Sequence, residues 1–344
     1  MAKIQLKEIC SFSKGCQING DELLENGEYD YLNGGINPSG KWNEYNVSGN
    51  TVTISEGGNS SGYVNYMPNP FWCGAHCYYL YELKCDVKYL YYALKSQQDK
   101  IMKLRSGACM PNIKKSDIGK FEFEYSSDTN VQKQIAANLD KVTHTIDLCN
   151  AILEKLDLLV KSRFVEMFGD FENLINKWHL YRFSDVTINL DNTRKPIKDA
   201  DRQKIQGIYP YYGATGIVDY LNDYRIEGEY LLISEDGKAL EFRNKDIAFI
   251  AKGKIWVNNH AHVLQCKENM NMVFLMFYMN NRDISSWVTG IDQKKLNRDN
   301  LDKMPVGVPP LALQERFAAF VEQTDKSKFI AKKIAESVRS VKIL

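Results

Sequence analysis

Apolar residues recur every three or four positions over a long stretch in the middle of the chain. The spacing alternates between four and three residues for about four heptads, a pattern typical of a coiled coil. This first seam comprises Ile135, Leu139, Val142, Ile146, Cys149, Leu153, Leu156 and Val160. A stripe this narrow suits a single partner helix better than a broad core face. We therefore predict a long helix over residues 129–168, which Ser127 or Asp128 could cap.

A second stretch near the end of the chain has the same spacing, although its middle is small and polar. Pro309 and Pro310 precede it, where a helix tolerates proline. A helix of roughly 30–35 residues spans about 45–50 Å, enough to separate two globular domains. We predict that the two helices form an antiparallel coiled coil; the alternative is that each packs on its own domain. The expected second seam is Leu313, Phe317, Phe320, Thr324, Ser327, Ala331, Ile334, Val338 and Val341.

The segments ahead of each long helix are mixed in character. Short β-rich runs bounded by glycine or polar residues predict strands at 51–55, 230–234 and 247–251. Two apolar runs, 88–97 and 272–281, predict short helices at corresponding places. We therefore predict that each segment forms an α/β or α+β domain.

The two halves of the chain repeat one another. Residues 107–118 resemble 290–301 at an offset of 183, and residues 132–140 resemble 314–322 at an offset of 182. Ile-Ser-Glu-x-Gly occurs at 54–58 and 233–237, and Trp-x-x-x-His at 72–76 and 256–260. This pattern predicts a tandem duplication with pseudo-twofold symmetry. The expected domains are 1–128, 129–168, 169–310 and 311–344, a globular domain and a long helix in each copy.

Charge and composition narrow the function classes. The chain carries 44 basic and 43 acidic residues, and residues 1–128 carry 13 basic against 15 acidic. Any binding to DNA would therefore depend on local cationic patches. No apolar run approaches the length of a membrane span, and the eight cysteines form no Cys-x-x-Cys pair. We expect a cytoplasmic protein with reduced thiols.

One cluster contains the residue types that bind zinc: Cys73, His76 and Cys77, with Cys85 nearby. The second copy has Val257, His260 and Ala261 in the equivalent places, so the element does not require thiols. We therefore expect no metal site. The recurring His76 and His260 fit either a structural hydrogen bond or a ligand contact.

Motifs for catalysis are absent from the sequence. It has no phosphate-binding Gly-x-x-x-x-Gly-Lys-Ser/Thr loop, no Gly-x-Gly-x-x-Gly turn and no Gly-x-Ser-x-Gly. We name no catalytic residue and expect no cofactor on this chain.

The loops carry residue types that suit nucleic acid, although ordinary polar loops have a similar composition. Amides can read adenine edges, glycines permit close approach and cations suit phosphates. The candidate DNA-contacting residues are Asn33, Asn37, Lys41, Trp42, Asn43, Asn59, Ser60, Lys114, Lys115, Tyr212, Thr215, Lys252, Lys254, Asn258, Asn259, Lys294, Lys295 and Arg298.

Taken together, the chain resembles a specificity subunit of a type I restriction-modification system. Pro-Leu-Ala-Leu-Gln-Glu-Arg-Phe at 310–317 is similar to the family's Pro-Pro-Leu-x-Glu-Gln-x-x-Ile helix entry, and copy one has the reduced form Val-Gln-Lys-Gln-Ile at 131–135. Three segments, 209–216, 232–237 and 253–260, resemble sequences that recur in the recognition domains of this family. Copy one departs more from these sequences.

The resemblance implies a non-catalytic subunit whose two recognition domains each read one half of a bipartite double-stranded DNA target. It also implies that the helices set the spacer and dock two methyltransferase subunits, and that motor-nuclease subunits join for cleavage. S-adenosylmethionine, ATP and Mg²⁺ are then expected only on those partners. Two alternatives stay open: a self-contained methyltransferase or nuclease, and a stand-alone DNA-binding regulator.

Overall fold

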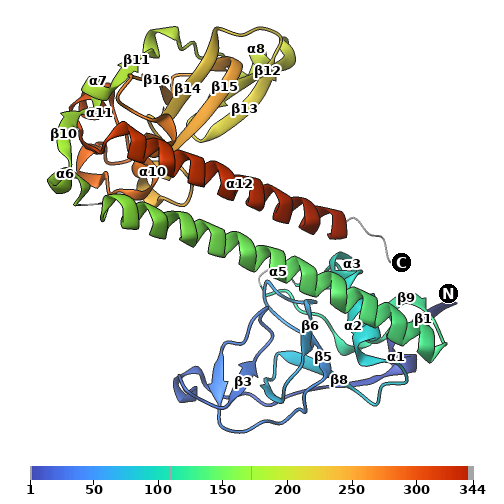
Figure 1. Cartoon of the computed structure of the whole chain (residues 1–344). Helices are drawn as coiled ribbons and strands as arrows, with labels where there is room; N and C mark the ends of the chain where they lie inside the picture. The colour runs from blue at the N-terminus through green and yellow to red at the C-terminus, as the bar shows by residue number, and fades with distance from the viewer. Residues whose placement is uncertain (1, 108–109, 172, 340–344) are drawn as a thin grey trace. The chain divides into compact units, whose positions relative to one another are not determined.

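The computed structural model describes residues 2–107, 110–171 and 173–339. Contacts divide the chain into two compact units, one formed by residues 1–148 with the end of the chain from 335, the other by 149–334. We call residues 2–128 the first head and residues 169–310 the second head. Each head combines short helices with β-sheets, which confirms the mixed α/β class (Figure 1).

The first head holds three small sheets. Their strand orders are β1-β9, β2-β8-β5-β6 and β4-β3-β7. Its elements are β1 Ala2–Gln5, α1 Leu6–Ile9, β2 Ser11–Lys14, η1 Gly20–Glu22, β3 Tyr29–Leu32, β4 Gly40–Trp42, β5 Thr51–Ser55, β6 Val64–Met67, β7 Phe71–Cys73, β8 Cys77–Tyr81, α2 Val87–Lys95, α3 Gln98–Met102, α4 Lys115–Gly119 and β9 Glu122–Tyr125.

The second head holds a pair, β10-β17, and a six-stranded sheet of order β11-β16-β14-β15-β12-β13. Strands β14 and β15 form its long antiparallel centre (Figure 1). The elements are α6 Leu174–Lys177, β10 His179–Arg182, α7 Phe183–Val186, β11 Thr187–Asn189, η2 Asp191–Thr193, α8 Asp199–Arg202, β12 Gln206–Gly213, β13 Gly216–Leu221, β14 Ile226–Ser234, α9 Lys238–Phe242, β15 Ala248–Val257, β16 Ala261–Cys266, α10 Met272–Asn281, η3 Ser285–Trp287, α11 Arg298–Lys303 and β17 Pro305–Val308.

The two heads share one topology, which confirms the tandem duplication. The order β2-β8-β5-β6 corresponds to β11-β16-β14-β15, and the parallel pair β3-β7 corresponds to the parallel pair β12-β15. Pro68 and Pro70 separate β6 from β7 in the first head, because proline lacks the amide that a central strand must donate. Non-proline residues stand at the equivalent positions of β15, so the second head joins the same strands into one sheet.

Individual hydrogen bonds repeat as well. The indole N–H of Trp72 donates to the Cys16 carbonyl at 2.8 Å, and that of Trp256 donates to the Lys195 carbonyl at 2.8 Å. Each long helix begins with a buried glutamine whose side-chain oxygen accepts from the amide of the residue that caps a short helix. Gln132 accepts from the amide of Asp86, which caps α2, and Gln314 accepts from the amide of Asn271, which caps α10.

The first long helix, α5, spans Thr129–Phe168, and the Asp128 carboxylate accepts from the amide of Asn130 at 2.8 Å. The second, α12, spans Leu311–Arg339 directly after the two prolines. All eight first-seam residues are buried or half-buried, whereas other apolar side chains of α5, such as Leu158, are exposed. The seam therefore lies on the covered face of the helix.

Within the second unit, α5 and α12 run antiparallel. Phe164 packs edge-on against Phe317 with ring centroids 5.3 Å apart. Further along, the Lys328 ammonium lies 2.6 Å from the Asp157 carboxylate. Because the numbering falls along one helix as it rises along the other, the two helices have opposite directions.

The expected seam of α12 is wrong in part. Ile334 is 44% exposed and Ser327 is exposed, whereas Val321 and Ala335 are buried. Phe317, Thr324 and Ala331 fit both the expected and the observed spacing, so the pattern alone could not separate the two phases. The second head's core decides between them, because Val321 is buried in that core while Phe320 is only half-buried at its edge. Val341 lies outside the described residues.

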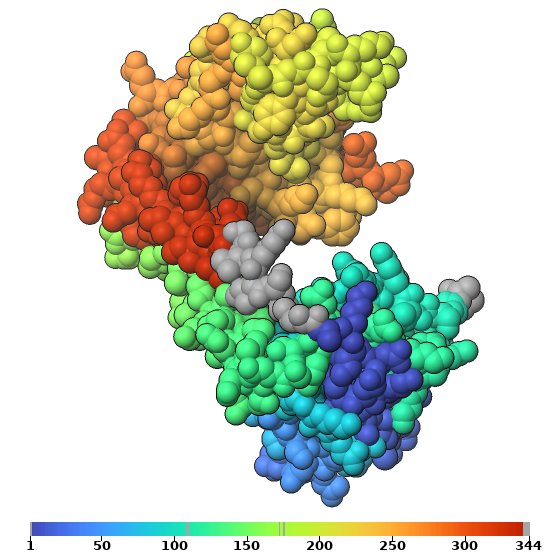
Figure 2. Space-filling view, turned by 90° about the vertical axis from the view of Figure 1, so that its right-hand side faces the viewer, coloured from blue at the N-terminus to red at the C-terminus, as the bar shows by residue number. Residues whose placement is uncertain are grey.

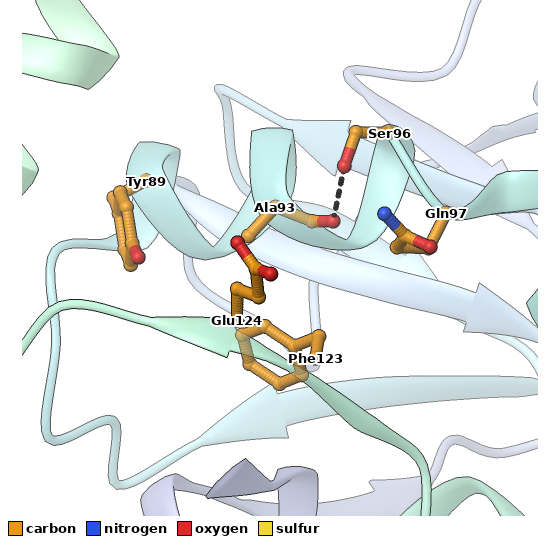
Figure 3. A pocket seen from close by; sticks show the side chains of 6 residues that line it. All are labelled: Tyr89, Ala93, Ser96, Gln97, Phe123 and Glu124. Carbon is orange, nitrogen blue, oxygen red and sulfur yellow. Dashed lines mark hydrogen bonds between the residues drawn. The ribbon is translucent and has the colours of Figure 1, made fainter. Parts of the chain in front are cut away.

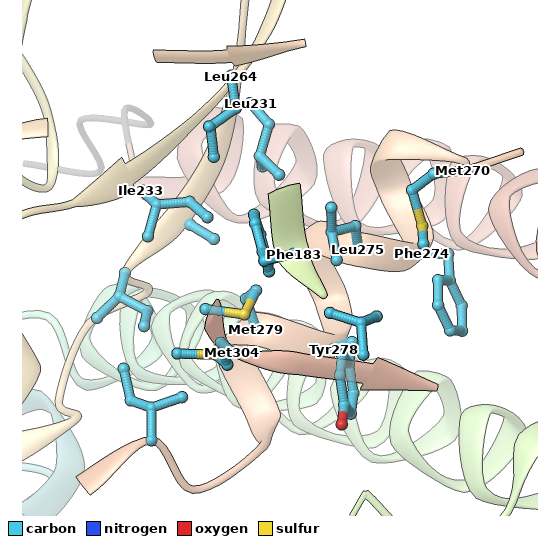
Figure 4. Close-up of a cluster of buried hydrophobic side chains, with 14 of the residues drawn as sticks. Phe183, Leu231, Ile233, Leu264, Met270, Phe274, Leu275, Tyr278, Met279 and Met304 are labelled. Atoms are coloured by element: carbon cyan, nitrogen blue, oxygen red, sulfur yellow. The ribbon is translucent and has the colours of Figure 1, made fainter. Parts of the chain in front are cut away.

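The main core of the second head joins the helices to the sheet. Leu231, Ile233 and Leu264 extend from the sheet, and Leu275 and Met279 extend from α10, around Phe183 (Figure 4). Phe164 and Phe168 of α5 belong to the same cluster. The end of α5 is therefore anchored by apolar burial in the second head.

Candidate nucleic-acid interface

Four loops meet at one edge of each head. In the second head they are 213–216, 234–238, 258–261 and 289–296; in the first head they are 33–35, 55–62, 74–77 and 106–113, of which 108–109 are not described. We call each set the loop edge of its head. Most of the candidate DNA-contacting residues lie in or beside these loops.

Backbone hydrogen bonds hold the loops of each edge together in the same way. The Glu56 amide donates to the His76 carbonyl at 2.8 Å, and the Glu235 amide donates to the His260 carbonyl at 2.9 Å. The Ile113 amide donates to the Glu56 carbonyl at 2.8 Å, as the Leu296 amide does to the Glu235 carbonyl. The repeated Ile-Ser-Glu-x-Gly and Trp-x-x-x-His motifs therefore meet in both heads.

Serine side chains tie the remaining loop to this arrangement. Ser55 donates to the Gly34 carbonyl, and Ser234 donates to the Ala214 carbonyl at 2.5 Å. Gly34 has a φ of 82°, a left-handed conformation that glycine adopts without strain. An added Cβ there would also meet the His76 carbonyl oxygen at 2.4 Å.

Most candidate residues are exposed or half-buried, as a contact surface requires. The exposed ones are Asn37, Lys41, Asn43, Asn59, Lys114, Lys115, Thr215, Lys252, Asn259, Lys295 and Arg298, and the half-buried ones are Asn33, Trp42, Ser60, Tyr212, Lys254 and Lys294. Strands β12 and β13, coloured yellow-green to yellow, form one surface of the second head (Figure 2). The role of the candidate residues in binding DNA stays a prediction.

Asn258 does not fit the expectation. Its side chain is 8% exposed, and its oxygen accepts from the backbone amide of His260 at 2.8 Å. Asn33 does the same for the His76 amide at 3.1 Å, but remains half-buried. Asn258 therefore shapes its loop and does not present its amide outward.

Several candidate cations are already paired. Lys252 contacts Glu229 at 2.6 Å, Lys295 contacts Glu235 at 2.9 Å, and Arg298 contacts Asp302 at 3.4 Å. Lys254 lies 4.8 Å from the centre of the Tyr224 ring. These side chains would have to exchange partners to meet phosphates.

A buried ionic network lies behind the second loop edge. His262, which is fully buried, has Nδ1 2.7 Å from an Asp191 carboxylate oxygen and Nε2 2.8 Å from the Leu296 carbonyl. Arg194 bonds to both carboxylates, those of Asp191 and Glu235. The network ties η2, β14, β16 and the last loop of the edge together.

The charges of this network are balanced. Burial raises the pKa of the Asp191 carboxyl, but the hydrogen bond and charge of His262 lower it further, so the net pKa lies below the usual value. The pKa of Glu235 is also lowered, since hydrogen bonds from Arg194 and Lys295 outweigh its burial. Both carboxylates are therefore ionised in the native protein near neutral pH.

Among the described residues, Asp191, Glu235 and His262 form a group with the spacing of metal ligands. Both nitrogens of His262 face acceptors, a carboxylate and a carbonyl, and Arg194 and Lys295 occupy the carboxylates. Protein cations thus already fill the place that an ion would take. We therefore interpret the group as a structural network of hydrogen bonds and ion pairs.

The cysteine cluster is not arranged as a metal centre. The Cys73 thiol lies 3.4 Å from the Cys77 carbonyl, and its hydrogen bond with Cys77 and its burial raise its pKa. Burial raises the pKa of Cys10 and of Cys85 to about 12 each. The His76 Nδ1 faces Glu56 at 3.4 Å instead of the thiols. The described cysteines are free thiols.

Two of the cavities bounded by described residues lie in the first head. One of about 480 Å³ opens at the loop edge and is lined by Lys14, Asn33, Glu56, His76 and Asn112 together with Gly57, Gly58, Met110 and Pro111. The other, of about 300 Å³, lies between α2 and β9 (Figure 3). In the second cavity the Ser96 hydroxyl donates to the Ala93 carbonyl at 2.8 Å, and Glu124 is the one charged residue among those drawn. The charged and amide side chains around the first cavity favour it as a binding site.

Sequence reasoning missed the ionic network and left His76 and His260 undecided. Two repeated motifs pointed to the place, because both carry ionisable side chains in each copy. The sequence could not show that they meet, because they lie some twenty residues apart in each copy and Asp191 is separated from His262 by 71 positions.

Comparison with known proteins accords with this geometry. The family model described as the type I restriction modification DNA specificity domain matches residues 1–158 and again residues 175–339. A Haemophilus influenzae protein named as a type I restriction enzyme specificity subunit is 39% identical over 138 residues, which are 40% of this chain and 35% of that protein. A Mycoplasma pneumoniae protein named as a type I specificity subunit is 30% identical over 250 residues, 69% of this chain and 66% of that protein. Both matches span less than two thirds of the relative.

The crystal structure of a type I restriction-modification S subunit from M. genitalium has the same fold. Its TM-score is 0.72 over 99% of this chain and 93% of that chain, at 23% sequence identity. Within the described residues, none of the helices combines the length and apolarity needed to cross a membrane.

Proposed function

The chain belongs to the type I restriction modification DNA specificity family, and from this membership we propose that it selects DNA for partner enzymes and has no catalytic activity itself. Each head reads one half of a bipartite target in double-stranded DNA. The long helices set the spacer between the halves and dock two methyltransferase subunits, with motor-nuclease subunits joining in the full complex. S-adenosylmethionine, ATP and Mg²⁺ belong to those partners.

The observation that carries this proposal is the repeated loop edge. Each head brings the same four loops together, rich in glycine, amides and cations, through equivalent hydrogen bonds. Base readout needs side chains with both donors and acceptors held on a rigid support, which these loops supply. Neither head has a net positive charge, so the partners contribute to the grip on the phosphates.

The helices support the spacer role. α5 contains 40 residues and is about 60 Å long at 1.5 Å per residue. The second head is anchored to it through the Phe164 cluster, and the first head through α2, where Lys88 and Tyr92 bond to Asp140. In this proposal the helices make the distance between half-targets a geometric property.

Exposed apolar side chains on both helices support partner docking. Leu148, Ile152 and Leu159 form a row on α5, and Ile330 is 58% exposed on α12. Large apolar side chains left in water on a helix mark interaction surfaces when they cluster. Ile330→Glu should therefore reduce co-purification of a methyltransferase subunit, whereas Lys332→Glu on the same helix should reduce it less. Equal retention by both variants would count against this surface.

Replacing residues 20–115 with the matching segment of another recognition domain tests modular reading. Sequencing of methylated sites should show a new first half-target and an unchanged second half-target. A change in both halves would refute the assignment of one half to each head. Leu153→Pro, which breaks α5 at a cost of about 3 kcal/mol or more, should disturb the spacer or the assembly.

Incubation of the purified chain with DNA, Mg²⁺ and labelled S-adenosylmethionine tests the enzymatic alternative. We expect neither methyl transfer nor cleavage. Activity of the chain without partner subunits would overturn the proposal, and a chain that bound DNA specifically but no methyltransferase would instead be a stand-alone regulator.

A further inference from the structure

An imidazole stands at the same position of both loop edges. His76 and His260 each follow a tryptophan by four residues, and each backbone carbonyl accepts from the glutamate of the Ile-Ser-Glu-x-Gly motif. The side chain of His76 is 62% exposed and that of His260 is 47% exposed. Both rings are therefore held by the fold yet open to a ligand.

A carboxylate faces Nδ1 of each ring, but it comes from a different motif position in each head. His76 Nδ1 lies 3.4 Å from Glu56, while His260 Nδ1 lies 2.9 Å from Asp236. Glu56 corresponds to Glu235, and Asp236 corresponds to Gly57, which has no side chain. The same pairing is thus built twice from different residues, so it is not merely a remnant of the duplication.

This pairing determines what each ring offers. Nδ1 of His260 forms a hydrogen bond with the Asp236 carboxylate, which only accepts, so Nδ1 carries the hydrogen and the neutral ring presents the Nε2 lone pair. Glu56 lies at ion-pair distance from Nδ1 of His76 and favours the same tautomer there. The amide oxygens of Asn33 and Asn258 hold the backbone beneath each ring. Each loop edge therefore offers a fixed acceptor beside a carboxylate, itself an acceptor.

Two converging acceptors select a ligand that donates. A phosphate is disfavoured, because its charge would lie close to Glu56 or Asp236. In the major groove, the groups that donate are the exocyclic amines of adenine and cytosine. In the first head the imidazole borders the cavity of about 480 Å³, which has room for a base edge.

We propose that His76 and His260 are specificity-determining residues whose Nε2 atoms accept a hydrogen bond from an exocyclic base amine, one in each half-target. Glu56 and Asp236 are positioning residues that hold the rings. This inference rests on the proposed function, since it requires that each head reads its own half-target.

The experiment selects binding sites from a randomised duplex library with the full chain purified from its host together with its partner subunits. The wild type should enrich a bipartite motif. His76→Ala should lose about tenfold of the preference for adenine or cytosine at one position of the first half only. His260→Ala should do the same in the second half, while His144→Ala, an exposed imidazole on α5, should leave the motif unchanged.

Asp236→Ala should reduce the same preference as His260→Ala, and Asp236→Glu should restore it. An enriched motif that both histidine variants retain, or a uniform loss of affinity for all sequences, would overturn the inference and leave the proposed function standing. Failure of the wild type to enrich any motif would overturn the proposed function itself.

Discussion

The two heads place different chemistry at the same point of one fold. In the first head the Tyr78 hydroxyl donates to the Ile113 carbonyl at 3.3 Å, and in the second head His262 Nε2 takes the equivalent position, 2.8 Å from the Leu296 carbonyl. Tyr78 pairs with Ile54 across the sheet as His262 pairs with Ile233. The neutral phenol of Tyr78 in the first head thus corresponds to the imidazole of His262, which charged side chains surround, in the second head.

The surroundings differ accordingly. Burial and the charge of Glu56 raise the pKa of Tyr78 to about 12, so it stays protonated beside the Lys14–Glu56 pair. The second head adds Asp191, Arg194 and Lys295 around the equivalent glutamate, Glu235. Backbone hydrogen bonds therefore preserve the loop edge in both heads, while the side chains that support it differ.

The attachment to α5 shows a parallel contrast, and Phe164→Ala tests it with the largest expected effect. Phe164 is fully buried between Phe171 and Phe274, so truncation should destabilise the second unit by about 3–5 kcal/mol. Asp140→Ala removes the polar attachment of the first head and should cost about 1 kcal/mol or less, since the pair is half-exposed. Denaturant unfolding followed by hydrogen exchange in each unit measures both values. Similar losses of stability in the two variants would contradict the difference between the apolar and the polar attachment.

His262→Ala is expected to be nearly as damaging. It leaves the Asp191 carboxylate buried with one partner fewer, and breaking a buried ion pair costs about 3–5 kcal/mol. The matched change Tyr78→Phe deletes a single neutral hydrogen bond, worth about 1 kcal/mol. Hydrogen exchange at β16 and β8 should report the difference, and equal effects would show that the ionic network adds nothing.

Acid should affect the second head before the first. The native pKa values of Asp191 and Glu235 lie below their usual values of 3.8 and 4.5, so these groups stabilise the folded state above that range. Their contribution is lost as the pH falls through the usual values towards the native ones. Hydrogen exchange corrected for intrinsic rates should show this, with a shallower pH slope in Glu235→Gln. A first head that opened at the higher pH would contradict the assignment.

The smallest effect is expected from making the heads alike. Asn112 corresponds to Lys295, so Asn112→Lys should place a cation near Glu56 and stabilise the first head by about 1 kcal/mol or less. Lys295→Ala in the second head should change stability by a similar amount in the opposite direction. Thermal unfolding at low and at high salt measures both, and a stabilisation that salt does not reduce would argue against an ion pair.

Local pattern was enough for much of the fold. The repeats, the strands β5 and β14, the helices α2 and α10 and the phase of the first seam all follow from residue spacing. Spacing decides these features because helix and strand periodicities act over a few neighbouring residues. Many of the candidate residues lie in loops, since glycine and amides mark turns, whereas their contact with DNA stays a prediction.

Packing decided the rest. The sequence allowed two alternative buried faces for α12. The burial of Val321 in the second head's core shows which of these faces is covered. Asn258 has the composition of a contact residue, yet its fold turns it inward onto the His260 amide. The ionic network joins residues from four distant segments, which no local pattern relates.

By itself, then, the sequence determined that this protein is a duplicated pair of α/β heads on long helices and that it resembles a DNA specificity subunit. The tertiary structure was needed to show which side chains meet at the loop edges, which carboxylates face the two imidazoles, and which cations pair with the carboxylates of the second head. The physical reason is that hydrogen bonds and ion pairs depend on distances of a few ångströms between remote segments, whereas periodicity describes only neighbours along the chain.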